Sequence, residues 1–352
     1  MFISGLGTAT PANRYTQQQC RQFAQTSEHI QRLSPRSQAI VKKVLRANNG
    51  IESRFLAFDS LAEAFALTPD ALHARFVQNA PAVATLAAER ALKDARSKPA
   101  QIDALIISTC TGYLCPGLTS YVSERLGLRP DVLALDLVGQ GCGAALPNLR
   151  TAEALLAAGR AAQVLSICVE ICSAAFYLDD DPGVLISACL FGDGAGAAVL
   201  TSAPNPGRRR IEWTAASTAL SVVDRDYLRF EQKNGMLRNI LTLEVPGLAA
   251  KHAETVLTAV LDQTGRLRAE ITAWIMHAGG REVLTALQER LQLQESELRW
   301  SASVLRDYGN VSSPCVFFVL QAALRDHAPG GWWWMSSFGA GFSCHGALLR
   351  VE

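Results

Sequence analysis

The chain has 352 residues, a formal net charge of +1, 49% hydrophobic residues and 18% charged residues. This length exceeds that of a small binding module, and the composition is typical of a chain that buries a large core. The near-zero net charge provides no broad basic surface for a polyanion, so we expect no nucleic-acid partner. A large globular enzyme is the leading interpretation.

Two further features narrow the class of protein. The segment MFISGLGTATPANRY lacks the basic residues and long apolar run of a secretion signal, so we expect a cytoplasmic protein. Residues 328–349 are uncharged but contain five glycines and lack helical periodicity, which favours buried loop and strand and no membrane partner. The nine cysteines form no CxxC pair, so neither a disulfide framework nor a metal site is predicted.

Apolar runs rich in Val, Ile and Leu alternate with longer segments of helical spacing, which is typical of an α/β protein with buried strands. In chain order we predict a helix over 81–95, strands over 104–108 and 132–137, a helix over 146–158, strands over 163–169 and 194–200, a helix over 246–264, a strand over 273–277, a helix over 281–291 and a strand over 316–319. Pro81 suits the first position of its helix.

Two parts of the chain resemble each other in the same order. ALIISTCTG (104–112) resembles AWIMHAGG (273–280), and LFGDGAGAAVL (190–200) resembles SFGAGFSCHGALL (337–349). We therefore predict two related halves, residues 1–205 and 206–352, divided at the SAPNPGRRR linker. Such a pair can place a catalytic group from each half at one shared site.

Cys142 lies between glycines, after one predicted strand and before a predicted helix. Backbone N–H groups and the helix dipole at such a position lower the pKa of a thiol below its ordinary value of about 8.5, which favours a nucleophile. The alternative interpretation is a buried cysteine in a glycine-rich turn.

Two more polar residues follow predicted elements in the second half. His277 ends the strand AWIMH, and Asn310 lies in the turn RDYGNVSSP. Each is also compatible with a structural role, as a strand-end histidine or a turn-forming asparagine. Together with Cys142 they suit thioester chemistry, in which a thiolate attacks and the imidazole and amide hold a developing oxyanion. Papain-like cysteine hydrolases use the same residue types, so residue types alone leave the reaction open.

Six segments carry a resemblance to a known family over nearly the whole chain. They are VGQGCGAALPNL (138–149), LFGDGAGA (190–197), EVPGL (244–248), IMHAGGREVL (275–284), RDYGNVSSPCV (306–316) and SFGAGF (337–342). In sequence and order they resemble the type III polyketide synthases related to chalcone synthase, within the thiolase superfamily. The resemblance implies an α/β thiolase fold, with two duplicated βαβαβ-type halves in a layered αβαβα arrangement.

The resemblance also implies roles for individual residues. Cys142 resembles the nucleophile that holds the starter and the growing chain. His277 and Asn310 resemble the pair that activates this thiol, promotes decarboxylation of malonyl-CoA and holds the thioester oxygen. Phe191 matches a gatekeeper between the CoA tunnel and the cavity, with a core aromatic as the alternative interpretation. The other residues matched to the substrate cavity are Thr111, Cys115, Cys172, Ala175, Asn239, Ser312, Gly339 and Gly341.

The resemblance implies that CoA meets basic groups at a tunnel mouth. The residues in the corresponding region are Lys42, Lys43 and Arg46. A solvated helix face explains these residues almost as well. The region of Thr111 and Cys115 includes a family residue that reaches across a dimer interface, so the resemblance implies a homodimer.

The chain departs from the plant enzymes at three places. No aromatic residue stands at the second gatekeeper position near Arg238 and Asn239. Cys172 and Ala175 are small, which would widen the cavity enough to admit a long aliphatic starter. The family loop GFGPG reads SFGAG here, which puts the cyclisation outcome in doubt. Separately, the three adjacent tryptophans 332–334 are predicted to pack in the core.

The sequence therefore predicts a type III polyketide synthase. It would extend an acyl-CoA starter by iterative decarboxylative Claisen condensation with malonyl-CoA, then cyclise the product to an alkylresorcinol, pyrone or related aromatic polyketide. No cofactor is expected, because the CoA thioesters are substrates. The nearest alternative is a ketoacyl synthase III of fatty-acid synthesis, but AGG after His277 is closer to the polyketide synthases. A cysteine hydrolase and an inactive scaffold are the remaining alternatives.

Overall fold

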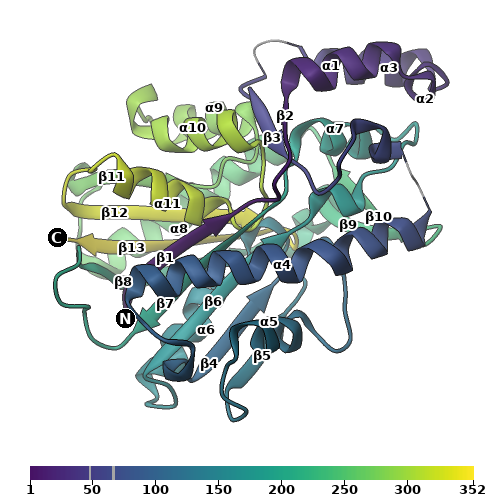
Figure 1. Ribbon diagram of the computed structural model, residues 1–352. Coiled ribbons are helices and arrows are strands. Elements are labelled where there is room, and N and C mark those ends of the chain that lie inside the picture. The colour runs from purple at the N-terminus through teal and green to yellow at the C-terminus, as the bar shows by residue number, and fades with distance from the viewer. Residues whose placement is uncertain (47–48, 66–67) are drawn as a thin grey trace.

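The computed structural model describes residues 1–46, 49–65 and 68–352 (Figure 1). The strands are β1 (Phe2–Ala9), β2 (Arg14–Thr16), β3 (Ser53–Phe55), β4 (Ala104–Ser108), β5 (Leu133–Leu137), β6 (Gln163–Glu170), β7 (Gly194–Thr201), β8 (Ile211–Leu220), β9 (Leu228–Lys233), β10 (Met236–Leu241), β11 (Ile271–Met276), β12 (Gly331–Gly339) and β13 (Ser343–Val351). The α-helices are α1 (Gln17–Thr26), α2 (Glu28–Gln31), α3 (Pro35–Val44), α4 (Pro69–Ala95), α5 (Leu118–Leu126), α6 (Ala145–Ala157), α7 (Pro182–Leu190), α8 (Val245–Thr264), α9 (Arg281–Arg290), α10 (Arg299–Tyr308) and α11 (Cys315–Arg325).

One strand pattern occurs twice in the main sheet, whose order is β11-β12-β13-β8-β1-β7-β6-β4-β5. β4 and β6 are parallel, and β7 is antiparallel to both β6 and β1. In the same way β11 and β12 are parallel, and β13 is antiparallel to both β12 and β8. The two sets meet where β1 pairs with β8. This repetition supports the predicted halves, while their division between residues 205 and 206 stays a prediction.

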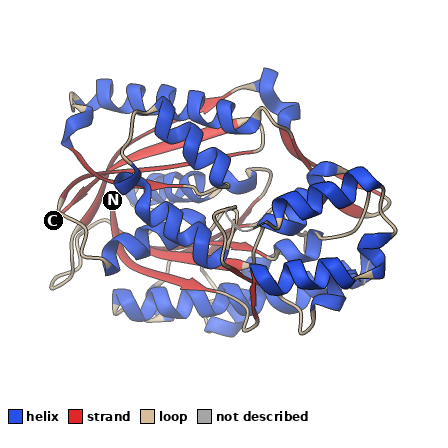
Figure 2. Ribbon diagram, turned by 90° about the horizontal axis from the view of Figure 1, so that it is seen from above, coloured by secondary structure: helices blue, strands red, loops and turns tan. Residues whose placement is uncertain are grey.

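Successive side chains of each strand face opposite sides of the sheet and pack into different cores. In β4, Ile106 packs into a core with α6 and α11, whereas Leu105 and Ile107 pack into a second core with α4 and α5. In β12, Trp333 joins the first of these cores and Trp334 joins a third core with α8 and α9. Helices therefore cover the two outer faces of the molecule, and a further layer of helices lies between the two parts of the sheet (Figure 2). This is the αβαβα arrangement that the resemblance implied.

The predicted elements agree with the structure within one or two residues except at two places. Pro81 does not begin a helix, because α4 starts twelve residues earlier at Pro69, after the N-cap Thr68. The long buried contact of α4 with the sheet keeps the helix continuous through the proline. Residues 316–319 are not a strand but the middle of α11. Residues 315–320 of this helix are all buried between the two parts of the sheet, so this stretch shows an apolar run without helical periodicity.

The uncharged segment 328–349 forms most of β12 and β13, as predicted. Trp333 and Trp334 are fully buried, which confirms the prediction of core packing for these two. Trp332 is half-buried, and the guanidinium groups of Arg266 and Arg350 lie over its ring. Across the described residues, no helix has the length and apolarity needed to cross a membrane.

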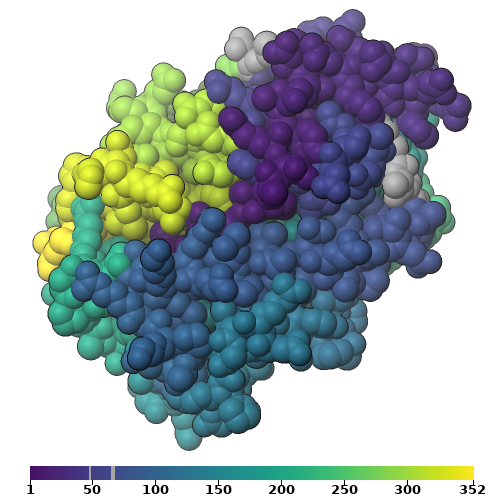
Figure 3. Space-filling model, viewed as in Figure 1, coloured from purple at the N-terminus to yellow at the C-terminus, as the bar shows by residue number. Residues whose placement is uncertain are grey.

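Helices α1, α2 and α3 form a separate layer, here called the cap, at the upper right of Figures 1 and 3. Apolar side chains from each cap helix pack on α7; the residues are Cys20, Ile30 and Val41 of the cap with Leu185 and Cys189 of α7. The hairpin β9–β10 lies beside α7 as well, because Asn239 of β10 donates a hydrogen bond to Ser187 Oγ (2.7 Å). Helix α7 is thus covered on two sides.

Close contact between α4 and β1 generates a prediction about stability. A Cβ atom at Gly7 would overlap the carbonyl oxygen of Ala87 in α4, whereas a Cβ at Gly247 of α8 meets no atom within 4 Å. We expect Gly7→Ala to lower the free energy of unfolding by about 1–3 kcal/mol or more, because backbone must shift. The matched change Gly247→Ala should leave it unchanged or raise it. Urea unfolding followed by circular dichroism measures both, and equal midpoints would contradict the close packing.

Candidate active site

Cys142 lies in a 3₁₀ turn, Gly141–Gly143, between β5 and α6. Gly141 has a φ of 54°, and a Cβ there would lie 2.9 Å from the backbone nitrogen of Ala340. A Cβ at Gly143 would lie 3.3 Å from the backbone nitrogen of Gly339. Glycine is therefore favoured at position 141 by its positive φ and close contact, and a side chain at position 143 would be tight, because the loop after β12 packs directly on the turn. The Cys142 side chain is 8% exposed.

A chain of hydrogen bonds joins the three predicted catalytic segments. Ser312 Oγ donates to Cys142 Sγ (3.1 Å), and the backbone N–H of Ser312 donates to Asn310 Oδ1 (2.9 Å). Asn310 Nδ2 in turn donates to the carbonyl oxygen of Gly279 (2.9 Å), two residues after His277. Ser312 has a φ of 57°, a left-handed conformation that is uncommon for serine and that these contacts hold in place.

His277 continues β11 by one residue, because its N–H donates to the carbonyl oxygen of Ser336 in β12 (2.9 Å). Its ring is 2% exposed and packs edge-on against Phe338, with ring centroids 5.0 Å apart. Among the described residues, no group forms a hydrogen bond with Nδ1. Packing, and not a carboxylate partner, therefore orients this imidazole.

Burial keeps the Cys142 thiol and the His277 imidazole neutral in the free protein. It raises the pKa of Cys142 to about 12 and lowers the pKa of His277 to about 4. The predicted lowering of the thiol pKa by the helix N-terminus is thus wrong in sign, because loss of solvent around the thiolate outweighs the dipole. At neutral pH the site holds a thiol and an uncharged imidazole.

Glu170 at the end of β6 is a site residue that the sequence reasoning missed. It is fully buried and accepts hydrogen bonds from the backbone N–H of Cys110 (3.0 Å), Thr111 Oγ1 (2.9 Å) and Ser313 Oγ (2.5 Å). Burial raises the pKa of its carboxyl group, and its charge raises the pKa of Cys142 further. An acidic residue inside the apolar run QVLSICVE was the available signal.

Phe191, the predicted gatekeeper, lies close to this site. Its backbone pairs with Asn310 in an isolated β-bridge, and Arg54 Nη1 donates to its carbonyl oxygen (2.8 Å). Its ring belongs to one apolar cluster with Cys142; the other buried members are Leu56, Phe58, Cys172 and Phe176. Phe191 is therefore held against the nucleophile by backbone and side-chain contacts.

Several residues that were predicted to line the cavity form hydrogen bonds or packing contacts within the protein. The hydroxyl of Thr111 binds Glu170, and the amide of Asn239 binds Ser187. Cys172 packs with Cys142, and Ala175 is half-buried at the end of the same 3₁₀ turn. Their roles toward a substrate stay predictions.

The glycine loop after β12 is fitted to the nucleophile turn. A Cβ at Gly339 would overlap the carbonyl oxygen of Gln140, and Gly341 has a φ of 124° that favours glycine. Ser337, where the family has glycine, donates a hydrogen bond to the carbonyl oxygen of Gly143 (3.0 Å). This substitution therefore adds a contact that holds the turn around the cysteine.

The remaining predicted residues lie outside this cluster. Lys42 and Lys43 in the last turn of α3 and Arg46 just after it are exposed, and Cys115 is exposed in the loop before α5. Searching the described residues gives no group of three or more His, Cys, Asp and Glu side chains placed to hold a metal ion.

Comparison with known proteins gives a consistent assignment. Residues 9–225 match the family described as FAE1/Type III polyketide synthase-like protein, and residues 229–351 match the C-terminal domain of chalcone and stilbene synthases. A relative from Amycolatopsis balhimycina, 3,5-dihydroxyphenylacetyl-CoA synthase, is 28% identical over 99% of this chain and 92% of its own length.

Solved structures agree with this assignment. PKS-I from the brown alga Ectocarpus siliculosus superposes with a TM-score of 0.91 and 26% identity, covering 99% of this chain and 98% of that one. The C-terminal type III polyketide synthase domain of Steely1 from Dictyostelium superposes with a TM-score of 0.90 at 24% identity, over 99% and 98% of the two chains. The fold is the thiolase fold, shared by acyltransferases that condense CoA thioesters. The chain belongs to the type III polyketide synthase family.

Proposed function

We propose that this enzyme extends an acyl-CoA starter with malonyl-CoA units and cyclises the product to an alkylresorcinol, pyrone or related aromatic polyketide. The observation that carries the proposal is the hydrogen-bonded chain from Cys142 through Ser312 and Asn310 to the loop that follows His277. This chain links the Cys142 thiol, the Asn310 amide and the loop that follows His277, and so supports a site shared by all three. The proposed steps use these side chains and the CoA thioesters, with no cofactor.

Loading of the starter begins from a neutral thiol. The sulfur of Cys142 attacks the thioester carbonyl, its bond to the carbonyl carbon forms, and the bond from that carbon to the CoA sulfur breaks. His277, uncharged because of burial, accepts the thiol proton and returns it to the departing CoA thiolate. Cys142 and His277 are both neutral before and after the step, so neither is left as a buried charge.

Extension then needs a carbanion equivalent. Malonyl-CoA loses CO₂, and the electron pair of the broken bond forms an enolate whose oxygen faces the Asn310 amide and His277. Asn310 Nδ2 uses one N–H on Gly279, which leaves the other for this oxygen. The enolate carbon forms a bond to the acyl carbon, the bond from that carbon to the sulfur of Cys142 breaks, and the departing thiolate takes up a proton from water by way of His277. The apolar cluster around Cys142 keeps water from hydrolysing the acyl-enzyme.

Two finer features are part of the proposal. Lys42, Lys43 and Arg46 supply exposed positive charge to bind the phosphates of CoA. The relative from Amycolatopsis balhimycina carries the name of an aromatic CoA thioester synthase, so retention of the product as a CoA thioester is a second candidate outcome.

We also propose a homodimer formed along β5. This strand ends the main sheet, and apolar side chains around it are exposed: Leu133 is 44% exposed, Val138 62% and Tyr113 72%. An uncovered edge strand beside exposed apolar side chains is typical of a surface that pairs with a second copy. Cys115, matched to a family residue that crosses the dimer interface, lies in the same loop as Tyr113.

If the dimer forms along β5, a charged side chain on this strand should weaken the association. We expect the protein to sediment as a dimer, and Leu133→Asp to shift it toward monomer, because a carboxylate would be buried against the partner. Leu267→Asp, at a 70% exposed leucine far along the chain, serves as the matched control and should stay dimeric. Sedimentation velocity measures all three, and a wild-type monomer would contradict the proposal.

The catalytic roles predict which variants lose which step. With malonyl-CoA and a panel of aromatic and aliphatic acyl-CoA starters, wild-type protein should form aromatic or pyrone products detectable by mass spectrometry. Cys142→Ala should abolish starter loading, whereas His277→Ala should retain some acyl-enzyme but lose decarboxylation. Cys344→Ala, at another buried cysteine with a pKa of about 12, is the control and should remain active. Use of malonyl only on a carrier protein would favour a ketoacyl synthase III instead.

Burial of the thiol predicts the pH dependence of alkylation. With the Cys142 pKa at about 12, iodoacetamide labelling of Cys142 should rise about tenfold per pH unit from neutral pH up to pH ~10 without a plateau. Glu170→Gln removes a negative charge and should shift this profile to lower pH. Peptide mass spectrometry separates Cys142 from the exposed Cys115. A plateau already at neutral pH would instead indicate a thiolate–imidazolium pair.

A further inference from the structure

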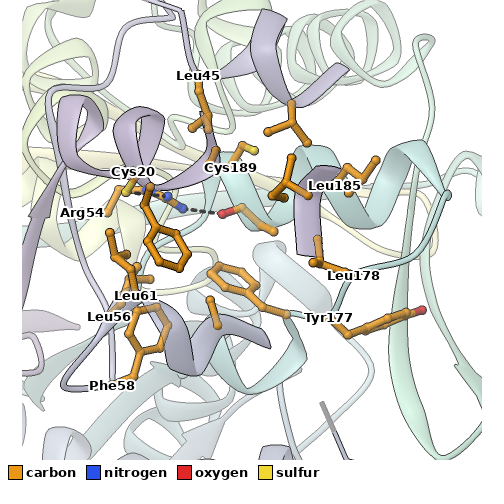
Figure 4. Close-up of a pocket in the computed structure, with 17 residues that line it drawn as sticks. Cys20, Leu45, Arg54, Leu56, Phe58, Leu61, Tyr177, Leu178, Leu185 and Cys189 are labelled. Atoms are coloured by element: carbon orange, nitrogen blue, oxygen red, sulfur yellow. Dashed lines mark hydrogen bonds between the residues drawn. The ribbon is translucent and has the colours of Figure 1, made fainter. Parts of the chain in front are cut away.

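Arg54 of β3 is a buried charged residue to which the steps proposed above give no role. It lies at the wall of a cavity of about 70 Å³ between the cap, α7 and the segment around Leu56 (Figure 4). Its side chain belongs to a residue that is 3% exposed, and its hydrogen-bond partners in the described part of the chain are all uncharged. Burial of a guanidinium without a carboxylate is unfavourable, so the hydrogen bonds that it forms must offset that cost.

The guanidinium binds the carboxyl end of α7. Nη1 donates to the carbonyl oxygens of Ala188 (2.7 Å) and Phe191 (2.8 Å), and Figure 4 shows the first of these bonds. These carbonyls carry the negative end of the helix dipole. Nη2 donates to Cys20 Sγ of α1 (3.4 Å). One nitrogen of Arg54 therefore holds both the last turn of α7 and the backbone of the gatekeeper.

The other end of Arg54 is fixed to the carboxyl end of α10. Ser53, the residue before it, donates a hydrogen bond from Oγ to the carbonyl oxygen of Asp307 (2.8 Å). The stem of Arg54 packs on Gly309, where a Cβ would lie 2.8 Å from Arg54 Cγ. Arg54 thus contacts the ends of two helices, α10 through its stem and neighbouring backbone and α7 through its guanidinium.

The segments that follow these two helices carry the gatekeeper and the amide donor. They pair in the isolated bridge of Phe191 with Asn310, where the N–H of Asn310 donates to the carbonyl oxygen of Leu190 (3.0 Å). The N–H of Gly192 donates back to the carbonyl oxygen of Asn310 (3.0 Å). Arg54 contacts both sides of this bridge, one at the carbonyl of Phe191 and the other at the glycine before Asn310.

We propose that Arg54 is a positioning residue that fixes the Asn310 amide relative to the gatekeeper Phe191. The inference rests on the proposed condensation, in which Asn310 donates to the enolate oxygen, and it names the side chain that keeps this donor in place. Misplacement of such a group by about 1 Å costs up to about a hundredfold in rate. Loss of the Arg54 bonds should therefore slow decarboxylation and leave the affinity for malonyl-CoA unchanged, because no group that binds CoA is displaced.

Two substitutions separate the hydrogen bonds of Arg54 from its bulk. Arg54→Met keeps an unbranched stem but has no N–H donor, and we expect its kcat for CO₂ release from malonyl-CoA to fall about tenfold or more, with KM within about threefold. Arg54→Lys should keep about half of the wild-type kcat or more, because both carbonyls bind a single nitrogen that an ammonium group can replace.

Arg209→Met is the matched control. The guanidinium of half-buried Arg209 also donates to a backbone carbonyl, that of Ala328 (2.5 Å), which precedes β12 while the site lies at the other end of this strand. This variant should keep the wild-type kcat. Iodoacetamide labelling of Cys142 should have the wild-type rate in every variant, and faster labelling in Arg54→Met would overturn the inference by showing that the whole site has loosened.

Hydrogen exchange followed by mass spectrometry tests the structural part without an activity assay. In Arg54→Met the amides of Gly192 and Asn310 should exchange about tenfold faster than in wild-type protein, because the bridge opens more often. Arg54→Lys and Arg209→Met should exchange at the wild-type rate. If Arg54→Met does not fold, Arg54→Gln, whose amide is too short to reach both carbonyls, takes its place with the same expectations.

A selective loss of kcat in Arg54→Met, its rescue by lysine and faster exchange at the bridge together support the inference. Equal kcat in all variants, equal losses with methionine and lysine, or unchanged exchange in Arg54→Met would overturn it while the condensation reaction stands. Wild-type protein that releases no CO₂ from malonyl-CoA would instead refute the proposed function, and the exchange rates of Gly192 and Asn310 would then decide whether Arg54 holds the bridge.

Discussion

The active site depends on the hydrogen bond from Ser312 to the sulfur of Cys142 and on the bonds that continue from it through Asn310. Cys142 belongs to the first structural repeat, whereas Asn310, Ser312 and His277 belong to the second. The proposed catalytic residues therefore come together only when the two repeats are packed against each other. Asn310 also pairs with the backbone of Phe191, so the same contact positions the gatekeeper.

Packing that brings these groups together also removes water from them. With a thiol pKa of about 12 and an imidazole pKa of about 4, Cys142 and His277 are both uncharged at rest. Glu170 places a carboxylate near Cys142, and among the described residues its hydrogen-bond donors are hydroxyl, thiol and backbone groups and include no Lys, Arg or His. In the proposed loading step, proton transfer from Cys142 to His277 would therefore wait for the thioester, because charge separation in the empty site is unfavourable.

The cap adds a second apolar region to a fold that is otherwise a layered repeat. Cap side chains complete the cavity above α7, and Arg54 connects the end of that helix to Phe191. The cap, α7 and the backbone of Phe191 are thereby joined by direct contacts.

The sequence by itself determined the strands and helices whose apolar pattern is local, such as β4 and α9, and the repeated order of motifs that indicates a duplicated fold. It also indicated Cys142, His277 and Asn310 from their places beside predicted elements. Tertiary structure decided that residues 316–319 are helical, because a helix buried between two parts of a sheet is apolar on every face. It likewise decided the Glu170 contacts and the neutral state of Cys142, since burial is set by neighbours distant in the chain and outweighs the local effect of a helix N-terminus.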